Sequence, residues 1–435
     1  MQLRNFLGID FILLFSTLIL AAFGILFIYS SGITSEGLLI SNEYQRQIIW
    51  AILGLVLALI IASLNYRRIY DLAVYIYLGT LVLLLATYIF GRVIHGTRWI
   101  RIGSFGFQAS EFAKVATIIF LAWYLDSTKR NQKTLSRFIV SSIIAIIPMV
   151  MVLLQPDLGT ALVFIPILLG MTYVAGVSPR YIIFFGLSII LGGILMLLPL
   201  WQTSIMSNSI PALMLLTNPR FVALCFVILC VITAISALGF FRYQRRYFYW
   251  ICYCVLILNI SLLASFVTQK FLRQYQMMRL IVFINPNIDP RGSGWQIIQS
   301  ITAIGSGGAL GKGFLQGTQS HYRYLPEQST DFIFSILAEE WGFFGGVIVF
   351  ALFLIILFRL TRIIRMSTDT FGSYIVAGLV SMYSFHFFVN VGMTMGIMPI
   401  TGIPLMFLSY GGSALISSMI GIGLALSVHV RRFLH

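Results

Sequence analysis

The chain has 435 residues, of which 59% are apolar and only 9% are charged, and its mean hydropathy is +0.96. Soluble proteins have roughly 25% charged residues, so this composition excludes a soluble surface. Apolar runs of about 20 residues recur without strand-like alternation, which predicts membrane-spanning helices rather than a barrel. The 28 basic and 13 acidic residues give a net charge of +15. In a membrane protein basic residues first set orientation and lipid contact, so we expect no nucleic-acid partner.

Twelve apolar runs predict an all-α, polytopic integral membrane protein with about twelve transmembrane helices. The first run is too long for the core of a signal peptide and no cleavage site follows it, so we expect it to remain as a span. The predicted spans cover residues 8–30, 47–64, 71–90, 111–126, 137–154, 159–176, 181–200, 221–240, 247–268, 332–358, 371–394 and 403–429.

Basic residues predict the orientation of these spans. If the N-terminus is cytoplasmic, every loop on that side is short and basic, and these segments hold 16 of the 28 basic residues, as the positive-inside rule requires. Both termini then lie in the cytoplasm, and residues 269–331 form one large extracytoplasmic loop. Loops of that length are usually functional. The prolines and glycines of this loop favour ordered, irregular backbone, although a flexible surface loop stays open.

Few ionisable residues lie within or beside the predicted spans, where each would cost about 2.5–3.5 kcal/mol at a helix centre. Glu111 and Lys114 are three residues apart on one helix face and can form an ion pair. A structural pair and direct contact with a substrate are both open. Asp157 lies in a turn between two spans, where it is either a functional acid or a helix cap. Asp331 lies at the start of another span with Thr330 as a possible cap, so capping competes with function there too.

The predicted loop contains Asp289, which lies between prolines in the string NPNIDPRGSG. A carboxylate fixed there could take a proton from a hydroxyl group, and such general-base catalysis is worth roughly 10²–10⁴-fold in rate. Asp-Pro also begins many ordinary turns. Basic side chains near this loop or near other spans could surround an anionic group such as a diphosphate. They are Arg98, Arg101, Lys114, Arg273, Arg279, Arg291 and Lys312.

We expect neither a nucleotide-binding loop nor a metal site built by the protein alone. The glycine-rich segment 305–313 lacks the glycine and the hydroxyl residue that a phosphate loop needs around Gly311 and Lys312. Its backbone amides could still hold phosphate oxygens. The five histidines have no metal-ligand spacing, and the four cysteines lie inside apolar runs and predict no disulfide framework.

Five stretches of the chain resemble the SEDS family, named for bacterial shape, elongation, division and sporulation, and in particular its elongation branch. They include LQPDLGTAL, the string around Asp289 and GTQSHYRYLPEQSTDFIF, and they follow the family's order over nearly the whole chain. Trp295, Ser329 and Met406 depart from the usual family residues, and none of them replaces Asp289. The stretches are residues 96–114, 154–162, 285–313, 317–345 and 392–414.

The resemblance implies a peptidoglycan glycosyltransferase that joins lipid II units into glycan strands at the outer face of the bacterial cytoplasmic membrane during elongation. Its partners would be a class B penicillin-binding protein, which crosslinks the strands, and other elongation proteins. The resemblance implies that Asp289 deprotonates a GlcNAc 4-hydroxyl, which attacks the anomeric carbon of a second lipid II as undecaprenyl diphosphate leaves. A divalent cation, Mg²⁺ or Mn²⁺, could bridge the diphosphate. The substrate-binding residues that it suggests are Arg98, Glu111, Lys114, Asp157, Arg291, Gln299, Lys312, Glu327 and Asp331.

The family has ten spans, whereas the apolar runs of this chain number twelve. We therefore expect one membrane domain over residues 1–435 in which the block 202–272 is an inserted two-helix hairpin. Two added spans preserve parity, so the loop that carries Asp289 keeps its side of the membrane. Partner docking, lateral guidance of lipid and neutral insertion are all open as the purpose of the hairpin.

Other functions stay open on the sequence alone. A lipid II flippase would also use acids inside the membrane, such as Glu111. The division branch of the same family would carry out the same polymerisation at another place in the cell. A small-solute transporter with inverted repeats is disfavoured, because the two halves of the chain show no clear repeat of broken helices.

Overall fold

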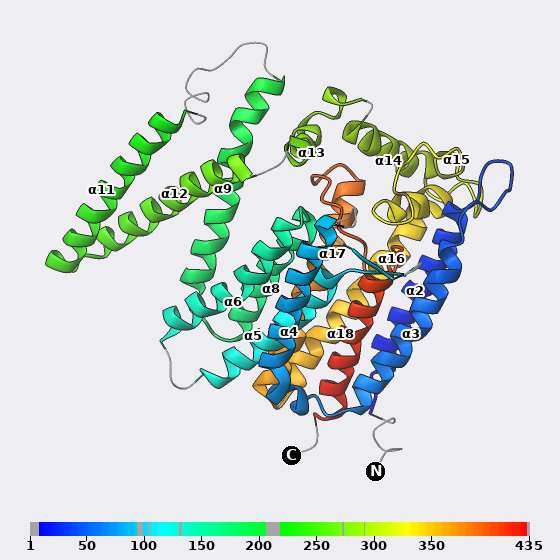
Figure 1. The fold of residues 1–435 in the computed structure, drawn as a ribbon, viewed down its shortest axis with the longest axis horizontal. Coiled ribbons are helices and arrows are strands. Elements are labelled where there is room, and N and C mark those ends of the chain that lie inside the picture. Colours follow the sequence, from blue (N-terminus) through cyan, green and yellow to red (C-terminus); the bar gives the residue numbers. More distant parts are fainter. Residues whose placement is uncertain are drawn as a thin grey trace. The chain divides into compact units, whose positions relative to one another are not determined.

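The computed structural model of this chain describes residues 8–93, 99–102, 105–129, 133–205, 218–271, 274–290 and 292–432 (Figure 1). The chain divides into two compact units, one made of Met1–Val177 with Gln296–His435 and the other of Ser178–Trp295. Ten helices in the described part are long and apolar enough to cross a membrane. The prediction of an all-α, multi-pass membrane protein is therefore confirmed.

The first unit is a bundle around two helices that are largely buried. α17 (Thr370–Thr394) packs against α5 (Ala109–Ser127), α8 (Phe164–Val174), α16 (Ile333–Met366) and α18 (Gly412–Val430). Within the most apolar window of each helix, 72% of α17 and 83% of α18 are buried, so polar side chains on these helices lie inside the unit. Its other elements are α2 (Phe11–Ser31), α3 (Glu43–Ser63), α4 (Arg67–Val93), β1 (Ile100–Ile102), β2 (Phe105–Phe107), α6 (Thr134–Leu154), α7 (Leu158–Leu162), α15 (Thr318–His321) and most of α14 (Ser293–Gly307).

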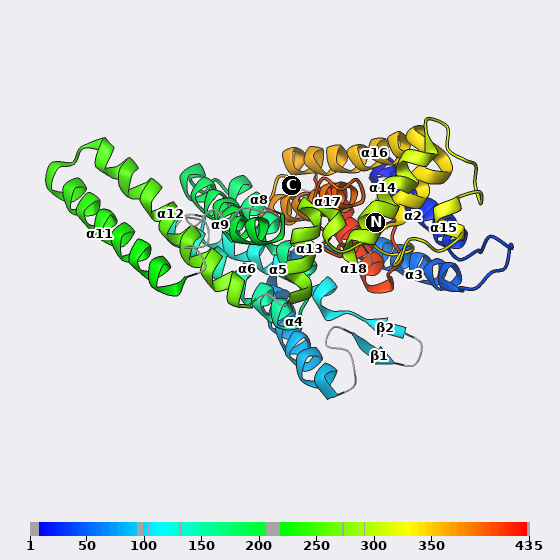
Figure 2. The ribbon, with the colours of Figure 1, turned by 90° about the horizontal axis from the view of Figure 1, so that it is seen from above.

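Strands β1 and β2 form a short antiparallel hairpin directly before α5, with Ile100 opposite Phe107 (Figure 2). This hairpin is not part of the sequence prediction. It is three residues long in each strand, which is too short for a strand pattern to stand out between two apolar runs.

Ten of the twelve predicted spans correspond to the ten long apolar helices. The two others are shorter or more polar. One is α5, whose 19 residues include Glu111, Lys114 and Asp126. The other is the run 159–176, which divides into α7 and α8 at Val163. Pro166 follows this division and cannot donate a backbone hydrogen bond, which weakens the helix there. The count of twelve spans stays a prediction.

The predicted span 403–429 is wrong at its start, because α18 begins only at Gly412. The residues before it are not helical. Gly402 and Phe407 have φ angles of 71° and 69°, in the left-handed region that a right-handed helix does not use, and Pro404 lies between them. The segment 396–411 therefore enters the unit as irregular backbone beside α17.

Residues 269–331, the predicted extracytoplasmic loop, contain ordered helices. They hold the end of α12 (Arg246–Phe271), α13 (Gln274–Ile284), the 3-10 helix η2 (Pro286–Ile288), α14 and α15. Much of this backbone is therefore helical, where the prolines and glycines predict irregular backbone, and the single large loop stays a prediction. The side of the membrane on which these helices lie stays a prediction.

The second unit consists of α9 (Pro179–Ile205), α11 (Pro219–Tyr243), α12, α13 and η2. α12 packs against both α9 and α11, and α13 packs against α9. α11 and α12 run side by side as a helical hairpin (Figure 2), whose turn contains Gln244 with φ of 49°. A helix pair within the block 202–272 is thus present, while its status as an insertion stays a prediction. The four cysteines, all on α11 and α12, are free.

Candidate functional site

A buried ion pair on α5 is the centre of the polar interior of the first unit. The Lys114 Nζ atom lies 2.9 Å from Glu111 Oε2, and both side chains are at most 2% exposed. Lys114 Nζ also lies 3.1 Å from His386 Nε2 on α17. An ammonium group only donates, so Nε2 accepts and the neutral ring carries its proton on Nδ1. Nδ1 in turn donates to the Pro404 carbonyl at 3.0 Å. The predicted pairing of Glu111 with Lys114 is confirmed.

Two residues of this interior, His386 and Asn390, were not predicted as site residues from the sequence. They are four residues apart on α17, so they share a helix face, and both are fully buried. Asn390 Nδ2 donates to the carbonyls of Asp331 and Ile403 at 2.9 and 2.8 Å. These bonds attach the segment 396–411 to α17. Two polar residues with helical spacing inside an apolar run are the signal that could have found them.

Asp157 is a helix cap, as one of the two predicted alternatives has it. Its Oδ1 atom accepts from the backbone N–H of Thr160 at 3.2 Å, and its Oδ2 atom accepts from Gln108 Nε2 at 3.0 Å. Gln108 is itself the residue before α5. A side chain at Gly159 would clash with the Thr401 carbonyl. Asp157 therefore fixes the starts of α5 and α7 close to the segment 396–411.

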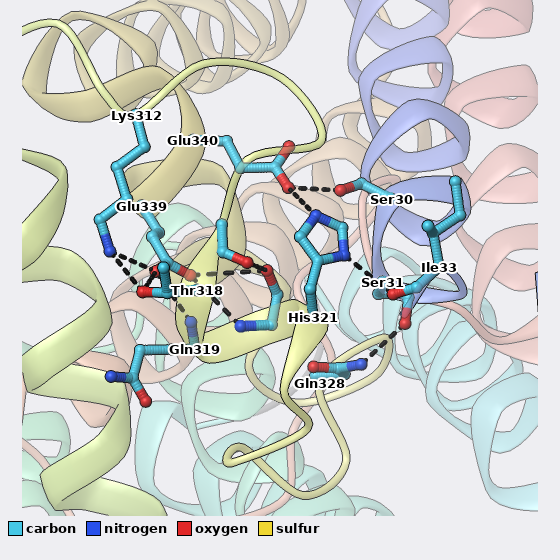
Figure 3. A network of polar contacts seen from close by, with 12 residues as sticks. Ser30, Ser31, Ile33, Lys312, Thr318, Gln319, His321, Gln328, Glu339 and Glu340 are labelled. Atoms are coloured by element: carbon cyan, nitrogen blue, oxygen red, sulfur yellow. Dashed lines mark hydrogen bonds and ion pairs between the residues drawn. The ribbon is translucent and has the colours of Figure 1, made fainter. Parts of the chain in front are cut away.

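A second buried network surrounds Glu339 on α16 (Figure 3). Its Oε1 atom accepts from Lys312 Nζ at 2.8 Å, from the Gln319 backbone N–H at 2.9 Å and from Thr318 Oγ1 at 3.0 Å. Lys312 is 25% exposed, whereas Glu339 is fully buried. The ammonium group predicted to meet a substrate is thus paired within the chain. Its contact with substrate stays a prediction.

Glu340, the neighbouring acid, joins α16 to the end of α2 (Figure 3). Its Oε1 atom accepts from the Ser30 hydroxyl and lies 3.6 Å from His321 Nε2. His321 Nδ1 lies 2.8 Å from the Ile33 carbonyl, which can only accept, so Nδ1 donates. The sequence analysis missed both Glu339 and Glu340. Two consecutive acids inside an apolar run are the signal that could have found them.

The glycine-rich segment 305–313 packs closely against α16. The Lys312 and Gly313 backbone N–H groups donate to the Glu339 and Glu340 carbonyls at 3.0 Å each. α16 changes direction at Gly342, whose φ of 64° favours glycine, and a side chain there would clash with Gly311 N. The glycines therefore permit the backbone of this segment to approach the backbone of α16 closely. The backbone N–H groups of Lys312 and Gly313 are already bonded within the chain.

An open cavity of about 390 Å³ lies next to the end of α2, and Glu327 is one of its lining residues. Glu327 is exposed and accepts from Thr330 Oγ1 at 3.3 Å. Phe332 precedes α16 and its side chain makes no cap hydrogen bond, so the prediction of Thr330 as the cap is wrong. A role of Asp331 in substrate binding stays a prediction. The cavity is lined by Ser31, Ile40, Ser41, Glu43, Arg323, Leu325, Pro326, Glu327, Gln328 and Ser329.

Asp289 lies in the second unit, directly after η2, in a turn that leads into α14. Its Oδ2 atom accepts from the Ser293 backbone N–H at 2.9 Å. Its carbonyl accepts from the Gly292 and Gly294 N–H groups at 3.3 and 3.1 Å. A side chain at Gly294 would clash with the Pro286 carbonyl. The half-buried carboxylate is thus held by a tight turn, which agrees with the expectation of fixed backbone around Asp289.

The other predicted substrate residues are less defined by the structure. Gln299 lies half-buried on α14. Arg98 and Arg291 lie outside the described residues. Among the described residues, no group of three or more His, Cys, Asp or Glu could hold a metal ion.

Comparison with known proteins places these features in a family. A family model described as "Cell cycle protein", which covers FtsW, RodA and SpoVE, matches residues 11–220 and 210–433. The peptidoglycan glycosyltransferase RodA of Treponema pallidum (strain Nichols) is 47% identical over 433 residues, which cover 99% of this chain and 100% of the relative. The probable peptidoglycan glycosyltransferase FtsW of Geobacter metallireducens is 31% identical, with 99% of this chain and 97% of that protein covered.

A solved structure agrees with the sequence relatives. One chain of a peptidoglycan synthase complex that coordinates polymerization and crosslinking has a TM-score of 0.67 and 26% identity to this chain. The match covers 98% of this chain and 99% of the other. The family model and the relatives each span nearly the whole sequence. The chain therefore belongs to the FtsW, RodA and SpoVE family, the SEDS proteins, and it is more similar to the RodA relative than to the FtsW relative.

Proposed function

We propose that this chain is a peptidoglycan glycosyltransferase of the RodA type, which joins lipid II units into glycan strands during cell elongation. The observation that carries this proposal is the 47% identity, over 99% of the chain, to a relative named for that activity. The fold adds support, because the chain is a multi-pass membrane protein and can therefore meet a lipid-linked substrate within the bilayer.

In this proposal Asp289 is the general base. Its carboxylate takes the proton of the GlcNAc 4-hydroxyl of one lipid II, and the resulting oxygen attacks the anomeric carbon of the other chain. The bond to the diphosphate breaks, undecaprenyl diphosphate leaves with the electron pair, and the configuration inverts. The support from geometry is that the Ser293 N–H holds one carboxylate oxygen at 2.9 Å, so the turn fixes the direction of the acid.

The leaving diphosphate needs positive charge around it, since charge develops on it as the bond breaks. We assign this role to Arg98, Lys114, Arg291 and Lys312. Lys114 is fully buried and paired with Glu111, so its effect in this state is electrostatic and positional. The proposed substrate-binding set is completed by Glu111, Asp157, Gln299, Glu327 and Asp331. Mg²⁺ or Mn²⁺ bound to the diphosphate would supply further charge, with oxygen ligands from diphosphate and water.

The same proposal assigns a location and partners. Both termini lie in the cytoplasm and Asp289 faces outward, which agrees with the short, basic inner loops. A class B penicillin-binding protein would crosslink the product, because the solved relative belongs to a complex for polymerization and crosslinking. The hairpin in block 202–272 is an insertion in this proposal. The two segments of the family match meet at residues 210–220, inside that block.

A lipid II flippase is the alternative from another class, and the division-type polymerase is the alternative within the family. The buried acids of the first unit are compatible with a flippase. The identity of 47% to the RodA relative against 31% to the FtsW relative favours elongation over division.

The test is polymerisation of purified lipid II by the purified full chain together with its cognate transpeptidase. We expect Asp289→Asn to lower the rate by roughly 10²–10⁴-fold, because asparagine cannot act as a base. Asparagine can still accept from the Ser293 N–H, so the turn should keep its shape. Glu36→Gln is the matched control, since Glu36 is an exposed acid in another loop.

Three outcomes separate the hypotheses. A normal rate with Asp289→Asn would remove Asp289 from the mechanism. Loss of rate in the Glu36→Gln control as well would show that the assay reports stability rather than chemistry. Movement of labelled lipid II across vesicles, without glycan chains from the wild type, would replace the polymerase with a flippase.

A further inference from the structure

Three helix ends of the second unit meet and carry four exposed arginines, which we call the arginine end: Arg180, Arg242, Arg245 and Arg246. Tyr253 of α12 donates its hydroxyl hydrogen to the Arg180 carbonyl at 2.7 Å. The Arg180 guanidinium lies 5.8 Å from the Tyr249 ring centre, and this ring lies 6.0 Å from Phe240 of α11. The starts of α9 and α12 and the end of α11 therefore adjoin.

No acidic residue can neutralise the arginine end from its own helices. The sequence contains no aspartate or glutamate between Asp157 and Asp289, a stretch of 131 residues. Arg359 in the first unit is different, since its Nε atom donates to Asp10 Oδ2 at 2.7 Å. The positive ends of two long helices, α9 and α12, lie at the same place and add to the positive charge. This arrangement suits an anion with several acceptor oxygens.

Aromatic side chains at the same level identify the kind of anion. Tyr243, Tyr247 and Trp250 are 65%, 57% and 52% exposed. Exposed tyrosine and tryptophan rings are typical of the headgroup level of a bilayer. Beyond them the middle of α11 exposes apolar side chains, such as Val231 and Ile235 at 51% and 61%. The aromatic rim therefore favours the phosphate of a lipid headgroup over a soluble anion as the ligand.

We propose that the arginine end binds the phosphate headgroup of an anionic phospholipid of the inner leaflet. This rests on the proposed orientation with cytoplasmic termini, and it is independent of the proposed chemistry. Basic clusters that only set topology need no defined arrangement. Here guanidinium groups, two helix starts and an aromatic rim converge, and such basic sites between membrane helices bind anionic headgroups.

The test compares the full chain with the double variant Arg245→Gln, Arg246→Gln in detergent. Native mass spectrometry would measure binding of phosphatidylglycerol and cardiolipin, with phosphatidylcholine as the neutral probe. We expect the double variant to bind the anionic lipids about tenfold more weakly, since each basic residue near a membrane surface adds appreciably to the attraction. Binding of phosphatidylcholine should not change.

A matched control is Arg362→Gln, Arg365→Gln at the end of α16, where both arginines are also exposed. These two lie at a helix C-terminus, whose carbonyls disfavour an anion, so we expect a change of less than about threefold. Equal losses in both double variants would overturn the proposal, because the attraction would then be diffuse.

Two further measurements fix the source of the phosphate. The first compares how far soluble glycerol phosphate and anionic phospholipid raise the thermal unfolding temperature of the chain. An equal increase with glycerol phosphate would show a soluble ligand and would overturn the lipid assignment. A tag inserted after Gln244 should be inaccessible from outside intact cells. Labelling of that tag from outside would place the arginine end on the outer leaflet and would contradict the proposal, while leaving the polymerase test unaffected.

Discussion

The two units of the chain differ in how their charged side chains are arranged. In the first unit buried acids and bases neutralise one another, as Glu111 does with Lys114 and Glu339 with Lys312. The second unit contains nine basic residues and a single acid, Asp289. Paired charges in the first unit can fix helices to one another. The arginine end of the second unit has no acid in its own helices, and its side chains are exposed.

This difference has an energetic reason. A charge inside a low-dielectric bundle is costly unless a partner and hydrogen bonds offset the loss of water. The first unit meets this cost with pairs that connect distant parts of the chain, such as Asp10 of α2 with Arg359 of α16. The arginine end avoids the cost, because its guanidinium groups are exposed.

The largest expected effect comes from breaking the pair on α5. Lys114→Met leaves Glu111 buried without its cation and should lower the free energy of unfolding by about 3–5 kcal/mol. Glu111→Gln should be similarly costly, because Lys114 would then face only His386 and a neutral amide. The double variant should recover much of this loss. Thermal unfolding of the three variants in one detergent measures the coupling.

The same variants separate architecture from substrate contact. If the pair only holds the bundle, the double variant should also recover lipid II polymerisation. If Lys114 acts on the diphosphate, activity should stay low in the double variant although stability returns. Single variants as stable as the wild type would contradict the buried pair itself.

Much of the fold can be predicted from the sequence, because membrane helices are encoded by local apolar runs. The pairing of Glu111 with Lys114 is also local, since three residues of helical spacing bring them together. The start of α18 could not be predicted. Residues 403–411 are largely apolar, and the left-handed backbone at Phe407 together with Pro404 keeps them out of the helix.

The contacts of the candidate site depend on tertiary structure. His386 is 272 residues from Lys114 in the sequence, and nothing local indicates that their side chains meet. Lys312 is 27 residues from Glu339, so the sequence spacing does not predict this ion pair either. Asp289 is the opposite case, because its turn is built by residues 286–294 and the proline and glycine pattern predicts it.

The next largest effect should come from Gly294, which permits the turn around Asp289. In Gly294→Ala the added methyl group would clash with the Pro286 carbonyl, so η2 and the carboxylate must shift. A misplacement of about 1 Å costs roughly 100-fold in rate, and we expect a loss of that size in lipid II polymerisation. Overall stability should change little, because the turn is local.

Gly305→Ala is the matched control on the same helix, α14. Nothing lies within 4 Å of the position that its methyl group would occupy, and alanine favours a helix over glycine. We expect normal activity and equal or slightly higher stability. Normal activity in Gly294→Ala would show that the turn does not position Asp289.

The smallest effects should come from removing one helix cap in each unit. Asp157 is buried and accepts from Thr160 N and Gln108 Nε2, whereas Asn218 is exposed and accepts only from Arg220 N at 3.0 Å among the bonds described. Loss of a cap costs about 0.5–2 kcal/mol. We expect Asp157→Ala near the upper end of this range, because it also leaves the Gln108 amide without that acceptor, and Asn218→Ala near the lower end. Thermal unfolding with hydrogen exchange at the starts of α7 and α11 would measure both. Equal losses of unfolding free energy in the two variants would mean that burial does not make the Asp157 cap stronger than the Asn218 cap.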